Sequence, residues 1–286
     1  MAVLLIILKT MVHMVEGTLI KKYNSKYSEG GFLFTGIVSL FSMLFFVISD
    51  TNGINFTGGI VPYGILGGIC YSSASIFTYI ALGCGSFALT MLVLSYSLMF
   101  SIVYGIVFLN DPVSAFTYIG IILMLISIYL IKSENSTESA KKAITPFWCA
   151  AMIISLFASG FLGILMKMQQ VKFNDMYSNE FMIITLAFSA VSLIGIGLIK
   201  DRGNILYIMK NGGVYAALSG ISNGVTNWLG LIVNMMMPIS IVSPVSAGIK
   251  NLITFLISLF IFKEKFNKKQ IIGVIIATLA LILFKI

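Results

Sequence analysis

The feature that most constrains this chain is a succession of apolar stretches, each about 20 residues long and separated by short polar connections. A helix of ~20 apolar residues is long enough to cross the hydrocarbon core of a bilayer. Ten such stretches are predicted, at residues 2–20, 31–49, 61–82, 86–109, 114–131, 147–168, 180–199, 213–235, 239–262 and 270–285. The expected fold is therefore an all-α integral membrane protein with ten transmembrane helices.

Composition excludes a soluble domain. Hydrophobic residues make up 58% of the chain, only 10% are charged, and the mean hydropathy is +1.02. A soluble domain carries roughly 25% charged residues to cover its surface. The apolar stretch that begins at Ala2 is long for a secretory signal, and it ends at residues 17–20 without a small-residue cleavage site, so it is expected to be a retained first helix.

The other compositional signals point to no cofactor and no nucleic acid. Cys70, Cys84 and Cys149 share no metal-ligand spacing and are expected to be small packing residues. The formal net charge of +8 comes from basic residues in short connections, which is the positive-inside pattern of membrane proteins. We therefore expect no metal, no other cofactor and no nucleic-acid partner.

The chain reads as two related halves. The polar stretch KSENSTESAKKAITP, residues 132–146, separates a first unit, 1–131, from a second unit, 147–286. Five helices per unit is an odd number, so the two units should lie in the membrane with opposite orientations, as in many secondary transporters. At an offset of 153 the matching pairs are Gly67 with Gly220, Asp111 with Glu264 and Gly120 with Gly273, and near the start of each unit Gly17–Lys21 overlies Gly163–Lys167.

The distribution of basic residues predicts the orientation. Thirteen of the 18 Lys and Arg residues lie in the connections after the first, fifth, seventh and ninth stretches, and three lie on the other side. Those thirteen are expected to face the cytoplasm, together with the 132–146 linker. The prediction is a multi-pass protein of the cytoplasmic (inner) cell membrane with both termini outside.

Two segments carry a resemblance to a known family. YIALGCGSFALTMLVLSYSLMFSIVYGIVFLNDPVSAFTYIGIILMLISIYLI resembles helices 3 to 5 of the EamA-type drug/metabolite transporter superfamily. PISIVSPVSAGIKNLITFLISLFIFKEKFNKKQIIGVIIATLALIL looks like a second copy of the same element and keeps the Ser-Pro often found there. The resemblance covers nearly the whole chain and implies a ten-helix transporter.

The first stretch also resembles another branch of that superfamily. His13-Met-Val-Glu16-Gly17-Thr-Leu-Ile-Lys21 is similar to the first helix of the small multidrug resistance exporters, where a membrane-embedded Glu binds protons and cationic substrates in turn. The resemblance implies that role for Glu16. This chain departs from the pattern at Lys9 and His13, which are additions, and it lacks the tryptophan that is usual in helix 1 of the ten-helix members.

Ionisable residues within the apolar stretches are the first candidates for a site. Lys9, His13 and Glu16 are spaced i, i+4 and i+7, so they share one helix face, and this face must look into the bundle because charge in lipid is costly. Lys250 falls at a similar depth in the second half. The alternatives are a structural Glu16–Lys250 ion pair, a Lys9 side chain that extends to the headgroups, and a His13 that only packs.

Polar residues in the neighbouring stretches complete the candidate site. The predicted substrate-binding residues are Glu16, His13, Lys250, Asn223, Asn227, Trp228, Tyr96 and Ser73, and the predicted proton-coupling residues are Glu16 and His13. The alternative for Ser and Asn is that they hydrogen-bond helices to one another.

The expected function is secondary active transport of a small polar organic solute (an amino acid, an amine or a related metabolite), by proton coupling or exchange. A midplane Lys suits a carboxylate or phosphate, and a Glu suits an ammonium. The alternatives are a transporter or flippase of a phosphorylated or lipid-linked metabolite, and a non-transporting membrane receptor or structural protein. An enzyme is not expected, because a single His and no paired membrane aspartates leave catalysis without parts. The expected partners are the small-molecule substrate and membrane lipids, with the chain as a monomer or homodimer.

Overall fold

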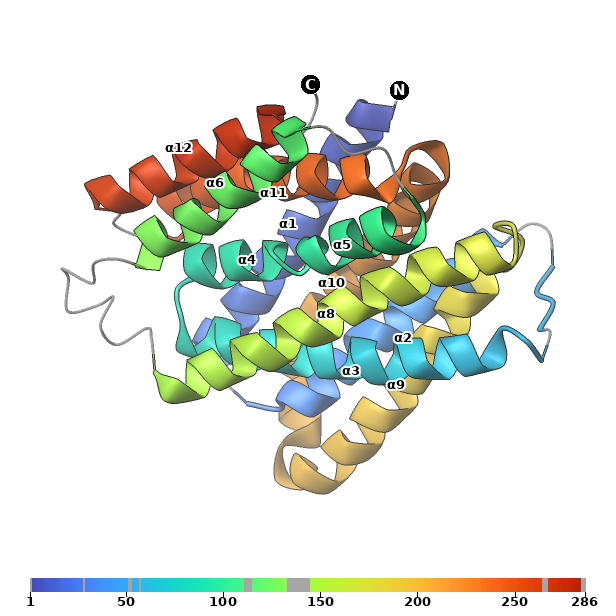
Figure 1. Ribbon diagram of the computed structural model, residues 1–286. Coiled ribbons are helices and arrows are strands. Elements are labelled where there is room, and N and C mark those ends of the chain that lie inside the picture. Colours follow the sequence, from blue (N-terminus) through green and yellow to red (C-terminus); the bar gives the residue numbers. More distant parts are fainter. Residues whose placement is uncertain are drawn as a thin grey trace.

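The computed structural model describes residues 2–27, 29–50, 53–56, 58–110, 115–132, 145–263 and 267–283. Within these ranges every regular element is helical. The helices are α1 (Ala2–Tyr27), α2 (Gly31–Ser49), α3 (Val61–Cys84), α4 (Phe87–Ser95), α5 (Leu98–Phe108), α6 (Ala115–Lys132), α8 (Pro146–Lys172), α9 (Ser178–Lys200), the short 3₁₀ helix η1 (Arg202–Asn204), α10 (Ile205–Met236), α11 (Ile239–Phe260) and α12 (Lys268–Leu283) (Figure 1).

An all-helical architecture follows from the composition, because in hydrocarbon every backbone N–H and C=O must find a partner within its own segment. Six segments of the described chain are long and apolar enough to cross a membrane: α1, α2, α3, the stretch Phe87–Phe108 that contains α4 and α5, α8 and α9. The protein is therefore a multi-pass membrane protein. Helices α6, α10, α11 and α12 coincide with the other four expected ranges, and the count of ten spans stays a prediction.

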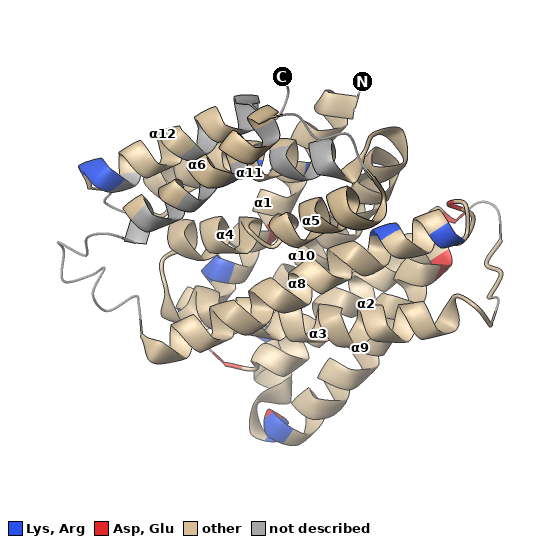
Figure 2. Cartoon of the chain, in the orientation of Figure 1, with Lys and Arg blue, Asp and Glu red and all other residues tan. Residues whose placement is uncertain are grey.

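The distribution of side chains agrees with a lipid environment. Large apolar side chains point outward along the helices, among them Val15, Val191 and Val214. Charged residues gather at helix ends and in connecting turns, and most of the helix length between them carries none (Figure 2). Such a surface is unfavourable in water and favourable in hydrocarbon.

The helix pairs repeat when the two halves of the chain are exchanged. Helix α1 packs against α10, and its counterpart α8 packs against α3; α2 packs against α10, and its counterpart α9 packs against α3. The pairs α2–α9, α6–α12 and α5–α11 join each helix to its own counterpart. In Figure 1, α6, α11 and α12 form one group and α2, α3, α8 and α9 another, with α1 running between them. This pairing is what two repeats related by a two-fold axis would produce, and their opposite orientation in the membrane stays a prediction.

One expected helix is interrupted. The stretch 86–109 was expected to be continuous, but it divides into α4 and α5 at a turn formed by Tyr96 and Ser97. Here the backbone makes i→i+3 hydrogen bonds, from Tyr96 N–H to Val93 O (3.1 Å) and from Ser97 N–H to Leu94 O (3.1 Å). The Ser95 hydroxyl donates to Leu92 O (2.6 Å), and side-chain bonds of this kind compete with the helical ladder.

The predicted linker at 132–146 falls mostly outside the described residues, since 133–144 are not described. The repeat pair Asp111 and Glu264 also lies outside them.

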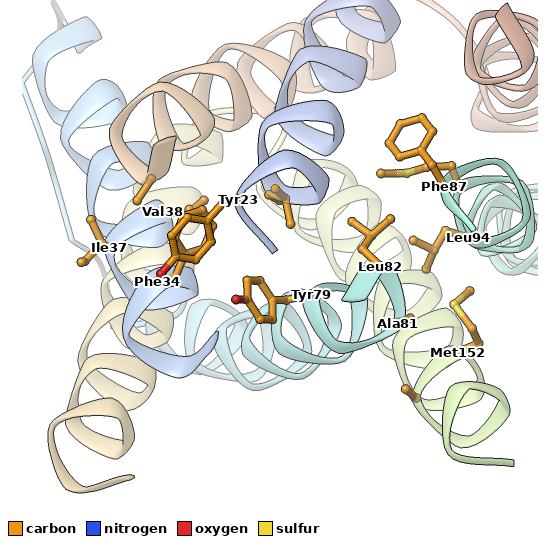
Figure 3. Packing of buried hydrophobic residues seen from close by; sticks show 14 of the residues in the cluster. Tyr23, Phe34, Ile37, Val38, Tyr79, Ala81, Leu82, Phe87, Leu94 and Met152 are labelled. Atoms are coloured by element: carbon orange, nitrogen blue, oxygen red, sulfur yellow. The ribbon is translucent and has the colours of Figure 1, made fainter. Parts of the chain in front are cut away.

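Two apolar clusters occupy opposite ends of α3. The first includes Tyr23, Phe34, Tyr79 and Leu82, at the end of α3 where the chain turns into α4. Figure 3 shows the Tyr23 ring lying on that of Phe34, with a centroid distance of 4.2 Å, and Tyr79 beside them. The second cluster surrounds the start of α3 and includes Ile60, Met166, Phe181, Leu186 and Leu231.

Helices α2 and α9 approach to backbone contact through glycines. A Cβ added at Gly36 would lie 2.8 Å from the backbone nitrogen of Ile194, and one added at Gly197 would lie 2.7 Å from that of Leu33. Neither neighbour is a flexible side chain, so the helices themselves would have to separate. Small residues at such crossings let helices pack closely where the hydrophobic effect gives no drive to associate.

The close α2–α9 contact predicts opposite outcomes for two neighbouring glycines. Gly197→Ala should lower the thermal stability of the purified protein, because overpacking costs about 1–3 kcal/mol. Gly195→Ala is the matched control, since a Cβ there meets nothing within 4 Å and alanine favours the helix by about 1 kcal/mol. Melting temperatures of both variants in one detergent test this, and equal stability of the two would refute the contact.

Candidate functional site

A cavity of about 290 Å³ lies between helices of both halves, and it contains five of the eight predicted site residues. His13 and Glu16 reach it from α1, Asn223 and Asn227 from α10, and Lys250 from α11. The remaining wall is formed by α2, α3, α8 and the α4–α5 segment. The cavity therefore gathers the polar residues that the sequence places far apart.

The α1 face toward the cavity is the one expected from the spacing of its ionisable residues. Lys9, His13 and Glu16 all line the cavity, and Gly17 continues the same stripe. The opposite face of α1 carries exposed apolar side chains, at positions Ile7, Leu8, Met11 and Val15. A helix with this division is oriented by its charges, because they avoid lipid only by facing inward.

Glu16 is held through one of its two carboxylate oxygens. Asn223 Nδ2 donates to Glu16 Oε1 at 2.9 Å. Glu16 Oε2 lies 3.3 Å from His13 Nδ1, but both atoms are buried and have no hydrogen-bond partner among the described residues. A buried acceptor without a partner is costly. Oε2 is thus the atom at which a proton or a cationic group of a ligand would be stabilised.

Asn223 is the centre of a polar network that links four helices. Its Oδ1 accepts from the hydroxyl of Tyr71 on α3 (2.6 Å) and from Asn227 Nδ2 (2.8 Å). The Ser42 hydroxyl of α2 lies 3.0 Å from the same oxygen and 2.7 Å from Gly220 O, and its single proton serves one of them at a time. With its oxygen occupied in this way, the Asn223 amide is oriented with its N–H groups toward Glu16.

Lys250 presents its ammonium to the cavity without a protein partner. The described residues include no hydrogen bond or ion pair to it, so it makes no direct ion pair with Glu16. One residue further on, Asn251 Oδ1 lies 2.6 Å from the Ser95 hydroxyl, whose single proton serves either this oxygen or Leu92 O, and the contact holds α11 against α4. Two opposite charges from the two halves thus share one cavity without neutralising each other by contact.

Three predicted site residues lie outside the cavity lining. Tyr96 is buried in a separate cluster, where its hydroxyl is 2.8 Å from Ser127 Oγ. Trp228 is 38% exposed on the outer face of α10. Ser73 is partly exposed, and its hydroxyl donates to Ile69 O (2.9 Å) within its own helix. Their neighbours in sequence, Ser97 and Asn227, line the cavity in their place.

Tyr71 lines the cavity but was not among the predicted site residues, although helical spacing in the sequence could have identified it. Tyr71, Ala74, Ser75 and Thr78 form the α3 stripe that lines the cavity, at i, i+3, i+4 and i+7. Ser73 is about 200° away from Tyr71 around the helix, at 100° per residue. Helical spacing from Tyr71 would therefore have separated the inward hydroxyls from the outward one.

Helix α8 lines the cavity with the positions that correspond to those of α1. Under the offset that places Gly17 on Gly163, the equivalents of four of the six α1 lining residues also line the cavity: Ser159 for His13, Leu162 for Glu16, Gly163 for Gly17 and Met166 for Ile20. The charged groups of α1 thus have uncharged counterparts on α8.

Comparison with known proteins agrees with this architecture. Residues 146–286 match the family described as EamA-like transporter family. A solved structure titled only "Crystal structure of protein" is similar over 100% of this chain and 98% of its own, with a TM-score of 0.68 and 13% sequence identity. At that identity the similarity concerns the fold alone. None of the curated protein sequences matches the chain.

The family match covers the second unit, and the structural similarity shows that the whole chain shares its fold with a solved protein. A fold that spans the whole chain, an apolar surface and a polar central cavity are all properties of a membrane transporter. The second half of the chain, residues 146–286, thus matches the EamA-like transporter family, a family of membrane transporters within the drug/metabolite transporter superfamily.

Proposed function

We propose that the protein is a proton-coupled secondary transporter of a small solute that carries both an amino group and a carboxylate, such as an amino acid. The observation that carries this proposal is the shared cavity of Glu16 and Lys250, in which the two charges make no direct ion pair. The cavity volume of about 290 Å³ is at the lower end of the ~300–1,000 Å³ typical of ligand pockets and suits a metabolite of this size.

The chemistry of the two groups is complementary to a zwitterion. The Lys250 ammonium binds the carboxylate of the solute, and Glu16 Oε2 accepts from its amino group. Asn223 keeps the other carboxylate oxygen of Glu16 occupied, so Oε2 is the oxygen left without a hydrogen-bond partner. A buried charge that gains a partner in this way loses the penalty of standing alone in a medium of low polarity.

Proton coupling follows from competition for the same oxygen. A proton on Glu16 removes the negative charge that binds the amino group, so a proton and the solute occupy the site in turn. His13, with Nδ1 3.3 Å from Oε2, is placed to pass a proton to or from the carboxylate. Because the proton and the solute bind in turn, the proton gradient can drive the movement of the solute.

Glu16→Gln is therefore expected to abolish the pH dependence of binding. In the wild type, affinity for the amino solute should rise with pH as Glu16 loses its proton. In Glu16→Gln, affinity should be weak and the same at every pH, and proton-driven accumulation in proteoliposomes should be lost while exchange persists. Unchanged proton-driven uptake in this variant would remove Glu16 from the coupling mechanism.

Lys250→Met tests recognition of the acid group. Because Lys250 makes no direct ion pair, the variant should keep its melting temperature and lose affinity for the carboxylate solute, by about 2–5 kcal/mol for a desolvated charge contact. A structural pair with Glu16 predicts something else: a loss of about 3–5 kcal/mol of stability, largely restored by adding Glu16→Gln. Binding of organophosphates but of no amino acid would favour the phosphorylated-substrate alternative instead.

Transport also requires that each end of the cavity open in turn, and two corresponding sets of contacts hold the two ends. At one end Lys21 Nζ donates to Leu82 O (2.6 Å) and Gly85 O (2.7 Å), and Asn24 Nδ2 donates to Tyr79 O (2.7 Å). These bonds tie the last part of α1 to the last turns of α3.

At the other end the corresponding residues of α8 make the same type of contact with α10. Lys167 Nζ donates to Asn234 O (3.0 Å), and Gln170 Nε2 donates to Leu231 O (3.3 Å). Under the offset that places Gly17 on Gly163, Lys167 corresponds to Lys21 and Gln170 to Asn24. The two sets lie at opposite ends of α3, because α8 runs antiparallel to it. The end of α8 reaches the first turn of α3, where Lys172 Nζ donates to the Tyr63 hydroxyl (3.2 Å). Repeats of opposite orientation would place matching contacts in this way. We call the contacts of Lys21 and Asn24 one latch and those of Lys167 and Gln170 the other.

The two latches should have opposite effects on access to the cavity. Lys21→Met should increase labelling of a single cysteine at Ser246 by an impermeant thiol reagent added from the Lys21 side of the membrane. Lys167→Met should increase labelling from the other side. The measurement uses vesicles of both orientations, in a background without the native cysteines, with the exposed Lys22→Met as control. Equal changes from both sides would contradict a two-ended gate.

A further inference from the structure

Lys9 is the one cavity-lining charge that the proposed mechanism does not use. The sequence left open that it extends to lipid headgroups, but its side chain turns inward and lies against α10. A Cβ added at Gly230 would be 3.1 Å from Lys9 Nζ and 3.3 Å from its Cε, so the missing side chain of Gly230 leaves the room that the ammonium occupies. A lysine in this position faces a ligand and not a lipid.

The surroundings of this ammonium are those of a polar subsite. Asn227 and Asn234 stand three residues before and four residues after Gly230, hence on the same face of α10, and both line the cavity. The part of the chain that the structure describes offers Lys9 no hydrogen bond or ion pair, and offers none to the Asn234 side chain. The Lys9 ammonium over Gly230 and the Asn234 amide one turn further along α10 are thus both available as donors.

Charge balance in the cavity argues for an acid group at this position. Lys9 and Lys250 contribute two positive charges and Glu16 one negative charge. A zwitterion adds no net charge, so one positive charge would stay uncompensated in the bundle interior. A solute with one further carboxylate brings the total to zero. Uncompensated charge within a membrane is costly, so the balanced complex is favoured.

The distance along α1 fits a solute that spans both groups. Lys9 and Glu16 lie seven residues, about 10 Å, apart on one face of the helix, at ~1.5 Å per residue. An amino group at Glu16 therefore leaves the far end of an extended solute directed toward Lys9. A carboxylate at that end would meet the ammonium and the Asn234 amide together.

We propose that Lys9 and Asn234, on either side of Gly230, form a second anion-binding subsite, so that the preferred solute is an amino acid with an acidic side chain. This inference rests on the proposed function, since it assigns the side-chain end of the same solute. It makes Lys9 a specificity-determining residue and leaves binding of the α-carboxylate to Lys250.

The test compares isosteric acid and amide ligands on the purified full-length protein. Affinities for L-glutamate and L-glutamine are measured by calorimetry, together with L-aspartate and L-asparagine. The wild type should bind each acid at least tenfold more tightly than its amide. Lys9→Met should bring the ratio close to one, Lys9→Gln should do the same while keeping a polar side chain, and Lys9→Arg should retain the preference because it retains the charge.

The control and the contrary outcomes are distinct. Lys22→Met removes an exposed lysine from the same helix outside the cavity and should leave the acid-to-amide ratio as in the wild type. Equal binding of acids and amides by the wild type, or a preference that survives in Lys9→Met, would overturn the subsite while leaving amino-acid transport in place. Binding of none of the four ligands would overturn the proposed function and this inference together.

Discussion

A charge within the hydrocarbon of a bilayer persists only where polar groups or a ligand surround it, and this constraint organises the centre of the molecule. Helix α1 carries Lys9, His13 and Glu16 on one face, and that face must be turned away from lipid. Once α1 is fixed in this rotation, α10 meets it with Asn223 and α11 meets it with Lys250. The charges on α1 therefore help to determine which helix faces enclose the cavity.

The frame around the cavity is held by a different kind of force. Helices in lipid gain nothing from the hydrophobic effect when they associate, so they depend on close packing and on buried hydrogen bonds. The glycine crossings of α2 with α9 supply the packing, and pairs such as Ser39 with Ser189 (3.0 Å between hydroxyl oxygens) supply bonds at the same interface. At the ends of α1 and α8 the apolar clusters around Tyr23 and Met166 add to the polar contacts of Lys21 and Lys167.

The sequence was sufficient for the helices and for the rotation of α1, because apolar length and the cost of charge are properties that a residue carries with it. The sequence was insufficient where the direction of a side chain depends on how its helix packs against a neighbouring helix. Trp228 follows Asn227 by one residue, a rotation of ~100°, and only the packing of α10 against α1 and α2 determines which of the two faces inward. Tyr96 was expected at the site from its position, but the helix ends at Ser95, and the turn directs the ring toward Ser127. The break itself depends on hydroxyl bonds that no apolar pattern reveals.

The two halves are alike in the polar contacts at the ends of α1 and α8, and they differ in the residues that line the cavity. Lys21 and Lys167, at corresponding positions of α1 and α8, bind the ends of corresponding helices. The cavity-lining positions have diverged, since Glu16 corresponds to Leu162 and Lys250 to Ser97. A fully symmetric site would bind a solute equally well in two reversed orientations. With the acid on α1 and the base on α11, the solute that we propose would have one favourable orientation. In the proposed mechanism the similar ends of the two halves serve the movement, and the different residues of the cavity orient the solute.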